Sequence, residues 1–187
     1  MLGVAALCGL ACAALVYLGT REPQLKPKEL IVREAFQVQV PTSGDWKMDE
    51  ERRQKEGADL VLEGTSSAFF PGYFVVQVIR PSSQPVSPVE LAEQVKKDWQ
   101  QQIDGCQFIE SGTPAPAAGL PALRLVAVGN AVPEVRDTPR REAYVLIVNG
   151  LGYRLNCIGY ARNFESLRPA FDELIASFQA RTPGKEP

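Results

Sequence analysis

Few residues of this chain have the types and spacing that catalysis or metal binding requires. The 187 residues contain no histidine, which removes the commonest general base, the histidine-activated nucleophiles and nearly all histidine-containing zinc sites. Two cysteines, Cys106 and Cys157, follow the N-terminal segment, and they do not form a Cys-x-x-Cys pair. They are either two small buried apolar side chains, which the pattern favours, or a disulfide formed in an oxidising compartment. The sequence therefore predicts no metal site and no cofactor.

The sequence also contains no motif for phosphate binding or nucleophilic catalysis. Gly150-Leu151-Gly152 precedes a predicted strand rather than a helix, so it is not a dinucleotide-binding loop. The segment from Gly64 to Ala68 lacks the glycine spacing of a nucleophile elbow. The acidic residues Asp172 and Glu173 are sequence neighbours on a charged helix surface and do not suggest paired catalytic acids. We expect a protein that is not an enzyme.

The composition is that of an ordinary globular domain. The net charge is −2, both signs are mixed along the chain, and no basic stripe is present, so nucleic-acid binding is not expected. About 165 residues follow the N-terminal segment, which is enough for one hydrophobic core.

The N-terminal segment, residues 1–20, carries no charged side chain. A helix over its apolar run would extend roughly 27 Å, enough to cross the hydrocarbon core of a bilayer. A retained transmembrane anchor is favoured over a cleaved signal peptide, because the run is long and has no basic residue before it. A third alternative is lipidation at Cys12, although Leu10 lies one position too close to it. The membrane is thus the first predicted partner, and the basic residues after the segment leave its orientation open.

The rest of the chain alternates between strand and helix signals. Residues 21–34 contain prolines and mixed charges, which suits a tether. Lys47 to Glu56 carries eight charges in ten residues, which indicates a solvated turn or short helix, with a docking surface as the alternative. Apolar and alternating runs predict strands at Phe36–Val40, Asp59–Glu63, Phe69–Arg80, Cys106–Ser111, Leu120–Val128, Arg141–Val148 and Leu151–Ala161.

Two helices and one hairpin have strong local signals. Ser87-Pro88-Val89-Glu90 combines a capping serine, a proline in the first turn and a capping-box glutamate, and predicts a helix to about Ile103. A last helix is predicted to begin at Ser166, with Asn163 as the alternative cap, because Pro169 belongs in a first turn. Asn149-Gly150 predicts a two-residue hairpin turn.

Two loops are candidates for binding a protein partner, since loops on a rigid scaffold commonly carry recognition. One spans residues 66–73 and the other residues 130–141. The candidate contact residues are the aromatic and basic side chains of these loops: Phe69, Phe70, Tyr73, Arg136 and Arg140.

Several short motifs resemble the PsbP/DcrB-like superfamily, over residues 35–178. The motifs are Phe36-x-Val38-x-Val40-Pro41 followed by Trp46, Gly119-Leu120-Pro121-Ala122-Leu123-Arg124, Tyr153-x-Leu155-x-Cys157, Phe164-x-x-Leu167-x-Pro169-x-Phe171 and Ala176-Ser177-Phe178. The resemblance implies an α+β domain, an antiparallel β-sheet flanked by helices on both faces, preceded here by the hydrophobic N-terminal helix. It implies no shared catalytic residue.

Members of this superfamily include exported lipoproteins, photosystem accessory subunits, a binder of a small GTPase and chaperones for transmembrane segments. The resemblance therefore implies a membrane-tethered, non-catalytic protein-binding or assembly module. Exported members favour the periplasmic or extracytoplasmic side. The alternative is a carrier or chaperone for an apolar ligand, either a lipid or a transmembrane segment. The predicted organisation is an anchor or uncleaved signal segment at 1–20, a tether at 21–34, the globular domain at 35–180 and a disordered tail at 181–187.

Overall fold

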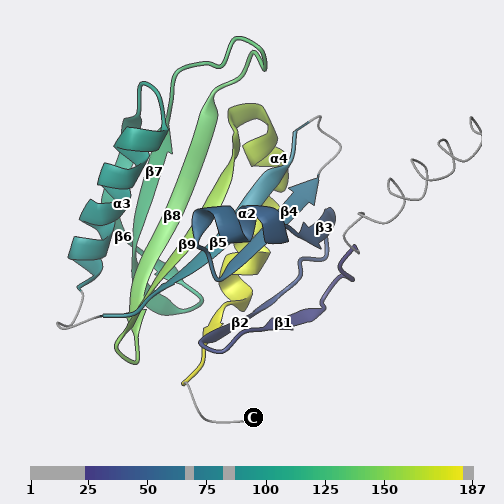
Figure 1. The fold of residues 1–187 in the computed structure, drawn as a ribbon, viewed down its shortest axis with the longest axis vertical. Helices are drawn as coiled ribbons and strands as arrows, with labels where there is room; N and C mark the ends of the chain where they lie inside the picture. The colour runs from purple at the N-terminus through teal and green to yellow at the C-terminus, as the bar shows by residue number, and fades with distance from the viewer. Residues whose placement is uncertain (1–23, 66–69, 82–86, 183–187) are drawn as a thin grey trace, which may run out of the picture.

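The computed structural model describes residues 24–65, 70–81 and 87–182, and within these ranges it contains two antiparallel sheets and three helices (Figure 1). The larger sheet has seven strands, in the spatial order β3 (Asp45–Met48), β4 (Leu60–Thr65), β5 (Gly72–Ile79), β9 (Leu151–Tyr160), β8 (Pro139–Val148), β7 (Leu120–Val128) and β6 (Gln107–Ala117). The smaller sheet pairs β2 (Phe36–Gln39) with β1 (Leu30–Val32) and β10 (Gln179–Ala180). The helices are α2 (Glu50–Glu56), α3 (Pro88–Gln102) and α4 (Ala161–Ser177).

The largest hydrophobic cluster joins α4 and the small sheet to one face of the large sheet. Phe178, just after α4, stacks on Phe36 of β2 at 5.9 Å between ring centroids and meets the ring of Tyr153 on β9 at 5.2 Å. The Tyr153 hydroxyl donates to the carbonyl of Ala35 at 2.9 Å, which satisfies the one polar atom of a fully buried ring. The small sheet is thereby fixed to the rest of the domain.

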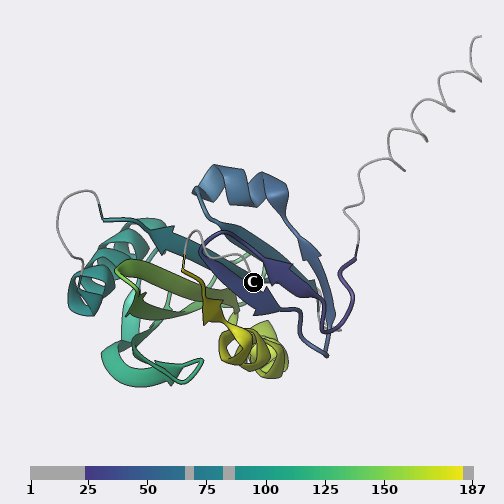
Figure 2. The same ribbon diagram turned by 90° about the horizontal axis from the view of Figure 1, so that it is seen from below.

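The opposite face of the large sheet is covered by α3 and α2. The apolar stripe of α3, which includes Leu91, Val95 and Trp99, packs on the β7 and β8 side chains Leu125 and Val145. Near the other end of the sheet, α2 crosses β4 and buries none of its own residues. Figure 2 shows α2 and α4 on opposite sides of the strands. The two helices α2 and α3 stand apart, and the strip of sheet between them carries the site described below.

Several local predictions are confirmed. Helix α3 has the predicted capping box, in which the Ser87 hydroxyl accepts from the Glu90 amide and the Glu90 carboxylate accepts from the Ser87 amide. Asn149 and Gly150 both have positive φ, 52° and 77°, and connect β8 to β9 as a tight hairpin turn. The charged segment before Gly57 forms the short solvated helix α2. The overall class, α+β with antiparallel sheets, is as predicted.

Three segments differ from the sequence prediction. The strand predicted to end at Ser111 continues to Ala117, because β6 is an edge strand and Pro114 and Pro116 can therefore occupy it without losing ladder hydrogen bonds. The last helix begins at Ala161 rather than Ser166, and Pro169 lies inside it. Contacts from outside the helix hold its first turn: the Ala161 amide donates to Thr138, and the side chain of Asn163, which is buried, donates to the carbonyl of Phe70.

The third difference concerns the tether. Part of residues 21–34 forms β1, and the Leu25 amide donates to the carbonyl of Trp46 at 2.8 Å beside the edge strand β3. Phe36–Val40, predicted as a strand, belongs to the separate small sheet. The predicted anchor at 1–20 lies outside the described residues, as does the end of the tail. None of the helices within the described ranges has the length and hydrophobicity to cross a membrane.

Candidate functional site

The candidate site is the strip of the large sheet left uncovered between α2 and α3. Strand register places three rows of side chains side by side on this face, because residues two apart along a strand point the same way. Tyr73 of β5 is paired with Ile158 of β9, which is paired with Arg141 of β8. The next rows hold Val75, Asn156 and Ala143, and then Gln77, Arg154 and Val145. We call this strip, with the helix residues that line it, the central groove.

Two adjoining cavities make up the central groove. The first has a volume of about 470 Å³ and lies against Tyr73, Ile158 and the loop at residues 130–139. The second, of about 460 Å³, lies over Gln77, Arg154 and Asn156. Arg141, Gln102 and Ile158 line both cavities, so the groove continues to either side of Arg141. The sizes fall in the range of ligand-binding sites.

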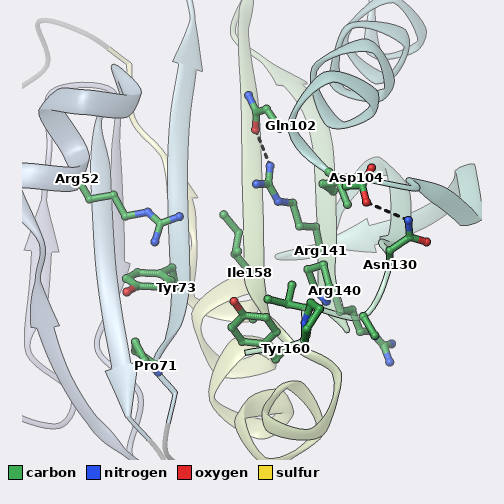
Figure 3. A pocket seen from close by; sticks show the side chains of 16 residues that line it. Arg52, Pro71, Tyr73, Gln102, Asp104, Asn130, Arg140, Arg141, Ile158 and Tyr160 are labelled. Carbon is green, nitrogen blue, oxygen red and sulfur yellow. Dashed lines mark hydrogen bonds between the residues drawn. The ribbon is translucent and has the colours of Figure 1, made fainter. Parts of the chain in front are cut away.

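The loop at one end of the groove is fixed to the C-terminal end of α3. The Asn130 side chain donates to the Asp104 carboxylate at 3.0 Å, and its backbone amide donates to the Asp104 carbonyl at 2.8 Å. Gly105 allows this contact, since it has a φ of +62° and a Cβ there would lie 2.3 Å from Asn130. Asp104 and Asn130 lie on one wall of the first cavity (Figure 3).

The opposite wall of the first cavity is made by α2 and β5. The guanidinium of Arg52 lies 3.8 Å above the ring of Tyr73 and is paired with Glu56 at 2.6 Å. Burial, followed by the nearby charge of Glu63, raises the pKa of Tyr73, although Arg52 opposes the shift. Tyr73 is therefore a neutral, half-buried aromatic wall that Arg52 holds in place.

Two further arginines lie on the floor of the groove. Arg154 is buried, and it donates to Asp98 of α3 at 2.8 Å and to the side-chain oxygen of Asn156 at 3.0 Å. Arg141 donates to the side-chain oxygen of Gln102 at 2.7 Å, as the dashed line in Figure 3 shows. In the described part of the chain Arg141 forms no ion pair. Burial, and then the charge of Arg154, lower the pKa of Arg141. Its charge is thus partly desolvated and is not matched by a carboxylate.

The guanidinium of Arg141 gives this arrangement the means to bind an anion. A guanidinium presents several donors in a planar fork that matches carboxylate oxygens. No group of three or more cysteines, aspartates and glutamates that could hold a metal occurs within the described ranges. The apolar side chains Ile158, Ile103 and Tyr160 beside Arg141 offer contact surface for the rest of a ligand.

The structure brings together only part of the predicted partner-binding set. Tyr73 and Arg140 both line the first cavity, and Phe70 packs on the ring of Tyr160 at 5.4 Å between centroids. Arg140 is paired with Glu165 at 2.8 Å. Arg136 is exposed, with a φ of 55°, and does not line the cavity. Phe69 lies outside the described residues. Their role in binding a partner stays a prediction.

Sequence reasoning missed the arginines that define the groove. Arg141 is the first residue of the predicted strand at 141–148, and Arg52 lies in the charged segment at 47–56 that was predicted as a solvated turn or short helix. One signal was present: Arg154 and Asn156 are two residues apart in an apolar strand and must share a face. Polar residues at this spacing in a central strand indicate a site or a buried network.

The two cysteines lie on opposite faces of the large sheet. Cys106 packs at the α3 face with Trp99 and Phe108, whereas Cys157 is buried in the cluster beneath α4. Both thiols are free, so of the two alternatives the sequence left open, the structure has two separate small side chains and no bridge.

Comparison with known proteins shows the class of fold. No family model matches the chain, and no curated protein matches it in sequence. Among solved structures, LpqN, described as involved in cell envelope biogenesis of Mycobacterium tuberculosis, is 14% identical, with a TM-score of 0.50 over 91% of this chain and 96% of LpqN. The cyanobacterial PsbP protein CyanoP from Synechocystis is 12% identical, with a TM-score of 0.50 over 88% of this chain and 99% of CyanoP.

A third structure, PA94 from Pseudomonas aeruginosa, a protein of unknown function, is 10% identical, with a TM-score of 0.53 over 84% of this chain and 99% of PA94. These three similarities confirm the predicted PsbP/DcrB-like fold. At identities this low they show the fold alone.

Proposed function

We propose that this chain is a non-catalytic binding module of the cell envelope that holds a segment of a partner protein in the central groove. A membrane anchor formed by residues 1–20 would keep the domain near the bilayer, with the globular domain on the extracytoplasmic side. The description of LpqN as an envelope-biogenesis protein supports this location by analogy of fold.

One observation carries the proposal. Side chains from three strands and two helices converge on the central groove, and the half-buried charge of Arg141 there has no carboxylate partner among the described residues. Buried and half-buried charges in folded proteins are normally paired, because desolvation of a lone charge is costly. A bound partner would supply the missing counter-charge. The unpaired charge of Arg141 therefore supports the proposal that the groove is a binding surface.

The alternative of an apolar carrier receives less support from the groove. A lipid tail or a transmembrane segment needs an extended apolar surface, whereas the groove floor holds Arg141, Arg154 and Asn156. Only the first cavity has a mainly apolar lining, and its volume of about 470 Å³ suits a few side chains rather than a lipid. We keep the carrier function as the second prediction.

Site-specific cross-linking in native membranes tests the proposal. A photo-activatable amino acid replaces Gln102, which is exposed and lines both cavities. The control position is Glu93, on the exposed part of the same helix. We expect one discrete protein adduct from position 102 and none from position 93. Adducts from position 93 together with none from position 102 would place the partner elsewhere and contradict the proposal.

A further inference from the structure

The arginines of the central groove differ in how their charges are balanced. Arg52 is paired with Glu56 at 2.6 Å, and Arg154 is paired with Asp98 at 2.8 Å. Among the described residues, the guanidinium of Arg141 has only the neutral side-chain amide of Gln102 as a partner, at 2.7 Å. Arg140, which also lines the first cavity, is paired with Glu165 at 2.8 Å. Of the four guanidiniums that line the groove, that of Arg141 is therefore without an ion pair among the described residues.

The other charged groups at the groove do not provide a counter-ion for Arg141. From α3, the Asp104 carboxylate accepts from Asn130 at the far wall and is not within ion-pairing distance of Arg141. From α2, the charge of Glu56 acts on Arg141 over a longer distance, but its ion pair is with Arg52, and Lys55 adds a further positive charge. The groove is thus locally positive in a chain whose net charge is −2, so it is electrostatically distinct from the rest of the molecule.

We infer that Arg141 anchors an aspartate or glutamate side chain of a partner segment that lies through the central groove. The inference rests on the proposed binding function and adds the chemistry of the partner. Arg141 lies where the two cavities meet, and the groove continues to both sides of it. A chain running through the groove would therefore present a carboxylate from its middle, with residues before and after it in the two cavities.

The charge count favours a carboxylate over a phosphate. A single carboxylate has one negative charge, which matches the one unpaired guanidinium, whereas a phosphate group carries up to two and favours a cluster of unpaired arginines. Arg52 and Arg154 would first have to leave Glu56 and Asp98 to form such a cluster. A carboxylate requires no existing ion pair to break.

The neighbouring side chains also fit an amino-acid chain with alternating character. In the first cavity Ile158 and Ile103 would contact an apolar side chain adjacent to the acidic one. In the second cavity the polar groups Gln77 and Asn156 offer amides for hydrogen bonds to the peptide backbone. The expected partner segment is an extended one in which an acidic residue follows or precedes an apolar residue.

Methyl NMR of the full-length chain in detergent micelles tests this inference. The isoleucine δ1 methyls are labelled with ¹³C, so Ile158 and Ile103 report on the groove and the core residues Ile31 and Ile175 serve as internal controls. The probes are two capped peptides, acetyl-Ala-Leu-Glu-Leu-Ala-amide and its glutamine counterpart, which differ in charge but hardly in shape. We expect the glutamate peptide to shift the groove methyls with about tenfold higher affinity than the glutamine peptide.

Matched variants assign the preference to one residue. Arg141→Gln should abolish the difference between the two peptides, while Arg162→Gln, which removes an exposed charge outside both cavities, should keep it. Unchanged shifts of Ile31 and Ile175 establish that both variants are folded.

Three results would overturn the inference. Equal affinities for the two peptides would remove the role of the carboxylate but leave groove binding intact. A preference that survives Arg141→Gln would assign it to another residue. If neither peptide shifts Ile158, the inference fails, and cross-linking at position 102 decides the proposed function separately.

Discussion

Arg141 and Glu142 are neighbours on β8, yet their side chains lie on opposite faces of the sheet and have opposite surroundings. The carboxylate of Glu142, which is 0% exposed, accepts from Arg124 and Arg168 at 2.7 Å each and from the Tyr144 hydroxyl at 2.9 Å. Arg141 faces the groove, where the neutral side chain of Gln102 is its one hydrogen-bond partner in the described ranges. The charge of Glu142 has counter-ions within the chain, whereas that of Arg141 has none among the described residues. The contrast separates a structural ionic cluster from a surface suited to a ligand.

The largest effect on stability should come from removing the charge of Glu142, whose counter-ions lie within the chain. Glu142→Gln leaves Arg124 and Arg168 without their shared counter-ion beneath α4, so we expect a loss of about 3 kcal/mol in the free energy of unfolding. Urea unfolding monitored by tryptophan fluorescence measures it. The matched control is Glu110→Gln, which also contacts Arg124, at 2.9 Å, but has a side chain that is 30% exposed. It should cost less than about 1 kcal/mol. Equal losses of stability for Glu142→Gln and Glu110→Gln would contradict the view that the buried carboxylate of Glu142 is the structural counter-ion.

The same cluster should make stability dependent on pH in the acid range. Burial raises the pKa of Glu142, but the hydrogen bonds from Arg124 and Arg168 outweigh burial and hold it below its ordinary value of 4.5. A lowered folded-state pKa gives stabilisation that is complete above the unfolded pKa and is lost as the pH falls through the folded pKa. The stability difference between the unmodified chain and Glu142→Gln should therefore be constant near neutrality and shrink below about pH 4.5. A difference that persists undiminished to pH 3 would disprove the role of ionised Glu142.

Removal of the charge of Arg141 should have a much smaller effect on stability. Arg141→Gln deletes a partly desolvated cation next to Arg154, so we expect a change within about 1 kcal/mol, neutral or stabilising. The same urea titration measures it, beside the NMR experiment on peptide affinity. A large loss of stability in this variant would mean that Arg141 is a structural residue like Glu142, and the contrast between the two faces would disappear.

The cysteines provide the mildest test of the two faces. Cys157 is 1% exposed beneath α4, and Cys106 is partly exposed at the α3 face; burial raises the pKa of both thiols. N-ethylmaleimide followed by peptide mapping should modify Cys106 in the native chain and Cys157 only after unfolding. Glu142→Gln should accelerate modification of Cys157 more than that of Cys106, because it loosens the face on which Cys157 lies. Equal acceleration at both thiols would indicate that the two faces unfold together.

Elements with local signals were predictable from the sequence. The capping box at Ser87 and the turn at Asn149 depend on hydrogen bonds and φ angles within four residues, so the residue types suffice. The start of α4 and the length of β6 were wrong for two different reasons. Hydrogen bonds from Ala161 and Asn163 to residues outside α4 hold its first turn, so the helix begins early and Pro169 lies inside it although its missing amide costs one helical hydrogen bond. The length of β6 follows from its place at the edge of the sheet, where a proline need not lose a ladder hydrogen bond.

The candidate site was predictable only in part. The predicted loop at residues 66–73 contributed Tyr73, and the predicted loop at residues 130–141 contributed Arg140; the structure places these two residues in β5 and β8. Arg141 and Arg52 were not singled out because each has ordinary surroundings in sequence, and their proximity is created by strands and a helix that are far apart along the chain.

The sequence by itself determined the class of fold, the capped helix, the hairpin and the lack of histidine chemistry, because composition and short-range spacing set these. Only the tertiary structure decided that α2 and α3 stand apart on one face of the sheet. It also decided that Glu142 contacts two arginines, while Arg141 forms no ion pair with a carboxylate of the described residues. Whether a charged side chain has a counter-ion depends on distances of a few ångströms between segments far apart in sequence. These distances exist only in the folded chain.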